Sequence, residues 1–201
     1  MIFEDVEVLD FCGPFEVFSV TRLNEERRRE QSSPFNVFLL GESKSPIVAS
    51  GGLKVLPDYD LDSCPPADIL VVPGGWGTRR EMNNERLLKW IADRSKQVAA
   101  LASVCTGSLL LGKAGLLDGK RATTHWRSLD WMQELFPKTT VERNLHFVDE
   151  GSLFTSAGIS AGIDMSLSIV ARHCGEAIAR ATAKHMEYPF PDSDKRRVIL
   201  A

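Results

Sequence analysis

One stretch of the chain, residues 98–115, constrains the fold more than any other, because it joins a buried strand to a helix. It reads VAALASVCTGSLLLGKAG. The apolar run over residues 98–102 is short and unbroken, which is typical of a strand buried on both faces. The second run, residues 108–114, has helix formers and is followed by Gly115, which predicts a helix with a left-handed cap. Cys105 lies on the turn between the two runs, so the stretch predicts a nucleophile elbow.

The predicted elbow presents a thiol at the end of a buried strand. Its motif is S-x-C-x-G in place of G-x-S-x-G, and it lifts the side chain of Cys105 out of the core. There the sulfur faces free backbone N–H groups and the positive end of a helix dipole, and both favour the thiolate. The alternative is a buried free cysteine, which is common in protein cores. Thr106, Gly107 and Ser108 open the helix, and this context favours a functional thiol.

Length, charge and cysteine use limit the class of protein. A chain of 201 residues can form one α/β domain with a sizeable core, which we expect to span residues 1–201. The net charge of −3 and the pI of about 5.8 leave no basic excess for nucleic acid or an anionic membrane surface. No apolar run approaches a membrane span and no signal peptide is evident, so we expect a cytoplasmic protein with reduced thiols. The cysteines, Cys12, Cys64, Cys105 and Cys174, form no C-x-x-C pair, so a zinc site is not expected.

Segments typical of strands alternate with segments typical of helices along the chain. The clearest buried strand covers residues 68–72 and ends at a Pro-Gly-Gly turn, and Asn84 caps a later helix. This alternation predicts an α/β fold with a mostly parallel sheet and helices on both faces. The other expected strands cover residues 35–40, 51–56 and 121–125, with a hairpin over residues 145–155, and the expected helices cover residues 85–97, 128–136, 160–174 and 177–188.

The N-terminal residues 1–3 look like the tail of a strand, because a buried parallel strand is usually about five residues long. Either the sheet starts short or the chain begins a few residues late. Gly13 and Pro14 then mark the start of a helix, with proline at the first helical position. Asp10 precedes them, either as a loop acid or as part of the helix start.

Several candidate site residues are expected at the carboxyl ends of strands, where α/β sheets bind ligands. These are Asp10, Gly74 with Gly75, Cys105 and His125, and they would share one rim. The N–H groups of the two glycines could hold a developing anion beside the thiol. Asp10 could hold a proton near the thiol, and His125 could pair with it. As purely structural residues, the glycines would form a turn, Asp10 would be a loop acid and His125 a packed side chain.

Three large apolar side chains could line a pocket beside this rim. They are Trp76, Trp126 and Ile159, although aromatic residues lie more often in the core. A turn of small residues near Ile159 leads into the helix expected from residue 160, and it can simply pack that helix closely against the elbow. Ser156 and Asp164, which flank this turn, have at most a secondary role in the predicted site.

Taken together, the motifs resemble the ThiJ/PfpI family of the class I glutamine amidotransferase-like superfamily, over nearly the whole chain. Within the family the chain looks most like the isocyanide (isonitrile) hydratase branch, and it also resembles the ligand-binding domain of AraC-type transcriptional activators. The motifs that carry the resemblance are Leu9-Asp10-x-x-Gly13-Pro14, Pro73-Gly74-Gly75, Ser103-Val104-Cys105-Thr106-Gly107-Ser108, Ala122-Thr123-Thr124-His125-Trp126 and Ser160-Ala161-Gly162-Ile163-Asp164.

The resemblance implies a flavodoxin-like three-layer sandwich, a homodimer and a cysteine nucleophile at the elbow. Asp10, Cys105 and Thr106 match the aspartate, cysteine and threonine of the hydratase branch. The implied reaction is attack of the thiolate on the isocyanide carbon to give a thioimidate, with Asp10 handling protons and water releasing an N-substituted formamide. The backbone N–H groups of Thr106 and Gly75 would be donors. No metal or organic cofactor is implied.

The chain departs from two other branches of the superfamily. Thr106 stands where the protease branch has a histidine, so peptidase activity is not expected, and the later His-Glu pair of glutamine amidotransferases is absent. The family's first strand also normally begins several residues before the Ile2-Phe3 segment. Two other functions stay open: a non-catalytic sensor of a small ligand, and an oxidative-stress protein that uses the same thiol on reactive carbonyls.

Overall fold

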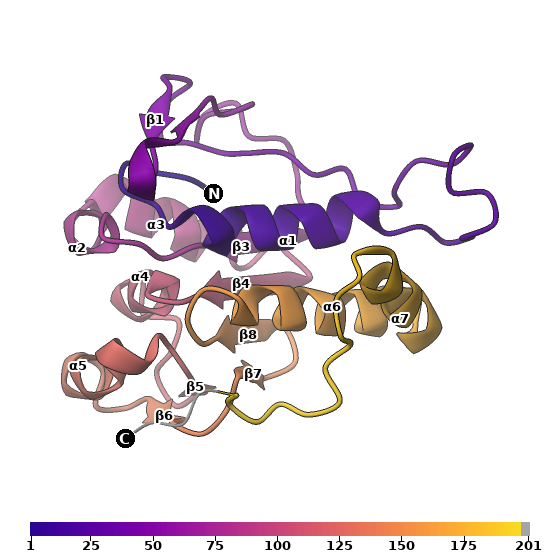
Figure 1. Ribbon diagram of the computed structural model, residues 1–201. Coiled ribbons are helices and arrows are strands. Elements are labelled where there is room, and N and C mark those ends of the chain that lie inside the picture. Colours follow the sequence, from indigo (N-terminus) through magenta and orange to yellow (C-terminus); the bar gives the residue numbers. More distant parts are fainter. Residues whose placement is uncertain (198–201) are drawn as a thin grey trace.

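The centre of the molecule is a four-stranded sheet, seen in a computed structural model that describes residues 1–197 (Figure 1). The strand order is β3-β4-β8-β7. β3 pairs with β4 and β4 with β8 in parallel, whereas β7 and β8 form the antiparallel hairpin expected over residues 145–155. The strands are β3 (Ile69–Val72), β4 (Ala100–Val104), β8 (Leu153–Ser156) and β7 (Phe147–Asp149). The mostly parallel α/β sheet predicted from the sequence is confirmed.

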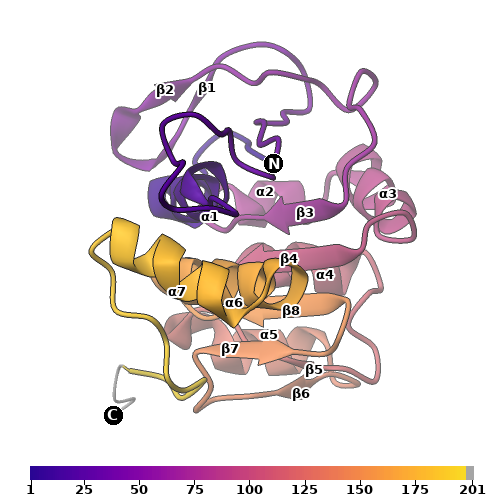
Figure 2. The same cartoon turned by 90° about the vertical axis from the view of Figure 1, so that its right-hand side faces the viewer.

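Helices cover both faces of this sheet, as Figure 2 shows. α1 (Val8–Val20), α6 (Ala161–Cys174) and α7 (Glu176–His185) lie on one face, and α3 (Glu85–Arg94), α4 (Gly107–Lys113) and α5 (Leu129–Leu135) on the other. The short α2 (Thr78–Glu81) precedes α3. Asn84 caps α3 as predicted, since its side chain accepts from the N–H of Leu87 at 3.1 Å. Within residues 1–197, no helix has the length and apolar character that crossing a membrane requires.

Two further pairs of short strands lie outside the central sheet. β1 (Ile47–Val48) and β2 (Lys54–Val55) form an antiparallel pair joined by η1 (Ser50–Gly52), and β5 (Arg121–Ala122) pairs in parallel with β6 (Thr140–Val141). The turn η2 (Trp126–Ser128) leads into α5.

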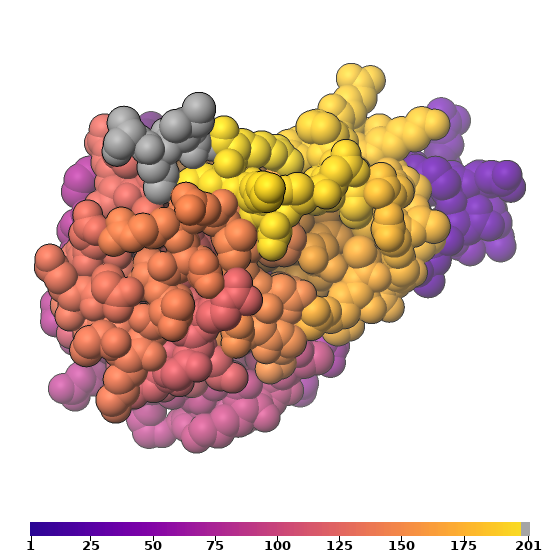
Figure 3. All heavy atoms as spheres, turned by 90° about the horizontal axis from the view of Figure 1, so that it is seen from below, coloured from indigo at the N-terminus to yellow at the C-terminus, as the bar shows by residue number. Residues whose placement is uncertain are grey.

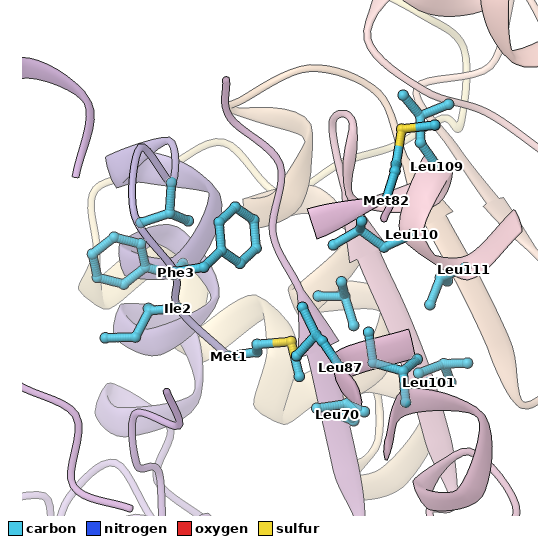
Figure 4. Close-up of a cluster of buried hydrophobic side chains, with 14 of the residues drawn as sticks. Met1, Ile2, Phe3, Leu70, Met82, Leu87, Leu101, Leu109, Leu110 and Leu111 are labelled. Atoms are coloured by element: carbon cyan, nitrogen blue, oxygen red, sulfur yellow. The ribbon is translucent and has the colours of Figure 1, made fainter. Parts of the chain in front are cut away.

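β4 divides the core in two, because successive side chains of a strand point to opposite faces. All of its residues are buried. Ala100, Ala102 and Val104 pack in the cluster under α1, α6 and α7, whereas Leu101 belongs to the cluster under α3 and α4. Figure 4 shows this second cluster around Leu101, with side chains from α4 and from the N-terminal residues. The small alanines allow the first set of helices to approach the sheet closely.

Two expectations about the N-terminal half are wrong. Helix α1 begins at Val8 rather than at Gly13, and Pro14 lies inside it. The chain is already held at Glu7, whose N–H donates to the carbonyl of Gly74 at 3.0 Å, so the helix can start directly after this contact. Residues 35–40 form no strand ladder, and Leu40 makes only an isolated bridge to Tyr59.

The N-terminal residues explain why residues 35–40 stay apart from the sheet. Met1 and Ile2 lie between that segment and β3: the amino group of Met1 donates to the carbonyl of Val71 at 3.1 Å, and Ile2 donates to that of Leu40 at 2.7 Å. Residues 1–3 themselves are not assigned as a strand. A cavity of about 590 Å³ continues this space and is lined mainly by apolar side chains of α1, β3 and residues 34–40.

We predict that Gly107→Ala destabilises the fold, because a Cβ there would lie 2.1 Å from the carbonyl oxygen of Val72. Helix α4 would have to move away from β3, at an expected cost of about 1–3 kcal/mol. Urea unfolding followed by circular dichroism measures the change. Lys113→Ala, an exposed position of the same helix, is the control and should stay within about 0.5 kcal/mol of wild type. Equal stability of both variants would contradict the prediction.

Candidate functional site

Cys105 lies directly after β4 and just before α4, as the elbow predicts, and its backbone is strained. Its φ of 56° is in the left-handed region that non-glycine residues seldom adopt. Its N–H faces the carbonyls of Ser156 and Ala157 at 3.2 and 3.0 Å. Its carbonyl accepts from the hydroxyls of Thr124 at 2.9 Å and Ser108 at 3.1 Å. These contacts from the neighbouring segments hold the strained conformation.

Backbone N–H groups and a hydroxyl face the sulfur. The N–H groups of Thr106 and Ile159 and the hydroxyl of Thr106 act on the Cys105 thiol as hydrogen-bond donors that favour its charged form. Ile159 also has a left-handed backbone, with φ of 53°. Ile159 was predicted as a pocket side chain, but its contact with the sulfur is made by its backbone, and its side chain is 37% exposed.

Asp10 is fully buried in the first turn of α1 and lies beside the thiol. Its Oδ2 accepts from the N–H of Gly74 at 2.9 Å. Its Oδ1 has no hydrogen-bond partner, although it is also buried. A buried carboxylate oxygen without a donor is costly, so the group has a strong tendency to take up a proton. Of the two structural positions open for Asp10, a loop or the helix start, the structure has the helix start, and its placement near Cys105 agrees with the predicted rim.

Burial perturbs both titrating groups of this pair. Burial and the charge of Glu7 raise the pKa of Asp10 to about 8, although the Gly74 N–H and the Cys105 thiol act in the opposite direction. Burial and the charge of Asp10 raise the pKa of Cys105 well above its usual range. The N–H donors favour the thiolate, as the elbow predicts, but burial and the charge of Asp10 act in the opposite direction and outweigh them.

The Gly74-Gly75 turn supports the side chains of the site. Gly74 donates to Asp10, and the N–H of Gly75 donates to the hydroxyl of Thr106 at 3.1 Å. A Cβ at Gly74 would lie 2.5 Å from the Thr106 nitrogen, so only glycine fits there. Thr78 also donates to the Thr106 hydroxyl at 3.2 Å. Both N–H groups therefore donate to side chains of the site. The predicted role of Gly74 and Gly75 as donors to a developing anion stays a prediction.

His125, Trp76 and Trp126 lie outside this cluster. His125 is half-buried, and its Nδ1 accepts from the N–H of Arg127 at 3.3 Å. Among residues 1–197, no hydrogen bond joins His125 to Cys105. Burial lowers the pKa of His125. Trp76 and Trp126 are 69% and 46% exposed, and the cavity of about 590 Å³ has none of the predicted site residues in its wall.

A buried polar cluster next to the site was missed by the sequence interpretation. Asp164, on the first turn of α6, is fully buried, and its Oδ2 lies 2.9 Å from the Nε2 of His146. Tyr188 donates to its Oδ1 at 2.9 Å. Nothing in the spacing of residues 146, 164 and 188 indicates this contact.

In the described part of the chain, no group of three or more His, Cys, Asp or Glu residues could hold a metal ion.

The family model for DJ-1/PfpI proteins matches residues 1–172. This chain belongs to the DJ-1/PfpI family. The resemblance to the ThiJ/PfpI family, and with it the flavodoxin-like α/β fold, is confirmed.

The chain is similar to two kinds of relative. The chain is 37% identical over 196 residues to an isonitrile hydratase of Pseudomonas putida, covering 96% of this chain and 79% of that protein. It is 36% identical over 154 residues to the HTH-type transcriptional regulator GbdR of Pseudomonas aeruginosa, covering 76% of this chain but only 41% of the regulator. The crystal structure of a ThiJ/PfpI family protein from Pseudomonas syringae matches with a TM-score of 0.81 at 29% identity, over 96% of this chain and 75% of that one.

We predict that Asp10→Asn removes a pH dependence of stability. In wild type the folded carboxyl, with its pKa of about 8, keeps a proton that the unfolded chain releases near pH 4. Folding stability should therefore fall as the pH rises from 5 to 8, by up to about 1.4 kcal/mol per pH unit. Asparagine does not titrate, so the stability of the variant relative to wild type should increase over this range. Urea unfolding at pH 5, 6.5 and 8 measures it, and a constant difference would contradict the prediction.

Proposed function

We propose that this DJ-1/PfpI protein is a cysteine-dependent isonitrile hydratase that converts an isonitrile and water into an N-substituted formamide. The observation that carries the proposal is the buried Asp10 carboxyl beside the Cys105 thiol, with the backbone N–H groups of Thr106 and Ile159 facing the sulfur. The 37% identity to an isonitrile hydratase over 96% of the chain supports it.

In the first step, the proton of the Cys105 thiol moves to the free Oδ1 of Asp10 while the sulfur attacks the terminal carbon of the isonitrile. That carbon then takes the proton back from Asp10, which gives a thioimidate, R–N=CH–S–Cys105. Asp10 can accept this proton only in its ionised form, and the burial that raises its pKa also makes that carboxylate a stronger base than an ordinary one.

In the second step, Asp10 takes a proton from water as the water oxygen adds to the thioimidate carbon. The nitrogen is protonated, the C–S bond breaks, and the formamide leaves as the proton returns to the sulfur. Cys105 leaves as a thiolate, and the N–H groups of Thr106 and Ile159 stabilise the charge that develops on it. Atoms balance as one isonitrile plus one water to one formamide.

We predict that Cys105→Ala and Asp10→Asn each abolish formamide production from an alkyl or aryl isonitrile, by at least about 10³-fold in kcat/KM. Cys105→Ala removes the nucleophile, and Asp10→Asn removes the base while keeping the size of the side chain. Chromatography of the formamide, corrected for an enzyme-free blank, measures turnover. Cys174→Ala, at a thiol on the C-terminal end of α6, is the matched control and should keep wild-type activity.

Equal turnover by wild type and Cys105→Ala would show that the thiol is not the nucleophile. Loss of activity in Cys174→Ala but not in Cys105→Ala would show that Cys174, and not Cys105, is the thiol that the reaction requires. Absence of turnover in wild type with both alkyl and aryl isonitriles would overturn the assignment of isonitriles as substrates.

We predict that kcat/KM rises with pH and levels off above an apparent pKa near 8. Below this pKa the Asp10 carboxyl is protonated and cannot accept the thiol proton, so the rate should fall about tenfold per pH unit. The apparent pKa belongs to the coupled Asp10–Cys105 pair rather than to one residue. Initial rates between pH 6 and 9.5 test this, and a profile that is flat or falls with rising pH would contradict it.

A second candidate is binding of a small ligand without turnover, which the 36% identity to the regulator GbdR favours. In this case a ligand would raise the melting temperature of the protein without being consumed. The oxidative-stress alternative receives less support, because burial raises the pKa of Cys105 and reactive redox thiols have lowered pKa values.

We also propose that the protein forms a homodimer. The exposed side chains of Trp76 and Trp126 provide apolar area that a second copy could cover. Analytical sedimentation tests the oligomeric state.

A further inference from the structure

The C-terminal tail returns from α7 to the edge of the molecule that carries the Cys105 loop. After α7 it runs past β7 toward β5 and β6 (Figure 1). Lys195 forms an antiparallel bridge with Leu145, and the N–H of Arg196 donates to the carbonyl of Asn144 at 2.7 Å. In the view of Figure 3 the yellow tail lies along the surface beside the orange segments. The tail is thus paired with the chain just before β7.

Two hydrogen bonds connect Arg196 to the backbone of Cys105, with Thr124 as the intermediate residue. Its guanidinium Nη2 donates to the carbonyl of Thr124 at 3.1 Å, and its Nε donates to the carbonyl of Arg143 at 2.7 Å. The hydroxyl of Thr124 in turn donates to the carbonyl of Cys105 at 2.9 Å. Arg196 therefore fixes the segment that holds one side of the strained Cys105 peptide.

Arg197 reaches the other side of Cys105 through the buried Asp164. Its Nη2 lies 2.7 Å from the Oδ2 of Asp164, and its Nη1 donates to the hydroxyl of Tyr188 at 3.2 Å. Asp164 is fully buried, and a buried carboxylate requires compensating partners. Since Asp164 lies in the first turn of α6, these partners also hold the preceding turn, in which the N–H of Ile159 faces the Cys105 sulfur.

We propose that the tail, residues 188–197, is a positioning element of the Cys105 site, in which Arg196 and Arg197 hold the two segments that set the geometry around the sulfur. Neither arginine touches the reacting atoms. Both act through other residues, Arg196 through Thr124 and Arg197 through Asp164. The proposal rests on the Cys105 site but not on the identity of its substrate.

The reactivity of the thiol toward iodoacetamide tests this proposal without any isonitrile. Mass spectrometry of the peptide that contains Cys105 gives its alkylation rate, and the partly exposed Cys174 in the same sample is the internal reference. We expect Arg197→Gln to slow alkylation of Cys105 relative to Cys174 by about tenfold, because a displaced Ile159 N–H no longer stabilises the charged sulfur. Arg197→Lys keeps a charge beside Asp164 and should restore most of the rate.

Arg196→Gln keeps the proposal testable if Arg197→Gln fails to fold. Arg196 is only half-buried and contacts carbonyls and a hydroxyl, so its loss leaves no buried charge unpaired. We expect about a threefold slower alkylation in this variant and an unchanged rate in Lys195→Ala. All rates are measured well below the melting temperature of each variant. An unchanged rate in both arginine variants would overturn the proposal, and so would a faster one, because the tail would then merely shield the sulfur.

Discussion

A carboxyl group buried against a thiol is the contact on which the rest of this site depends. Asp10 loses its hydration and recovers one hydrogen bond, from Gly74, so its pKa rises to about 8 and its carboxylate, once deprotonated, is a stronger base than an ordinary carboxylate. The thiol of Cys105 is also held protonated by burial. Both groups therefore favour their neutral forms, and in the proposed reaction the thiol gives up its proton to Asp10 only as the sulfur attacks the substrate.

The backbone around the sulfur is built for this contact. Cys105 and Ile159 both adopt left-handed conformations, which side chains with a Cβ take up only under constraint. The constraint comes from the strand β8, from the hydroxyls of Thr124 and Ser108, and from close packing at Gly74, where no Cβ fits. Strain at Cys105 is thus balanced by contacts from segments that lie far apart in the sequence.

Local sequence signals were sufficient for some elements, and contacts between distant segments overrode them at others. The run over residues 98–102, the cap at Asn84 and the hairpin through residues 149–151 depend on neighbours along the chain, and the structure has all three. Residues 35–40 have the composition of a strand but form no ladder: Ile2 contacts Leu40 and Met1 contacts Val71 of β3, and the rest of the segment lines the cavity that β3 also borders. The Gly13-Pro14 signal for a helix start was overridden by the contact of Glu7 with Gly74.

The sequence by itself determined the elbow, the α/β class and the family, because strand and helix periodicity and the motifs around Asp10 and Cys105 are local properties of the chain. Only the tertiary structure decided the direction in which the pKa of the Cys105 thiol shifts, since desolvation depends on what surrounds a group rather than on its neighbours in sequence. It also decided that Ile159 contributes its backbone, that His125 stands apart, and that His146 and the tail meet at Asp164. These contacts join segments whose separation along the chain carries no signal of their proximity in space.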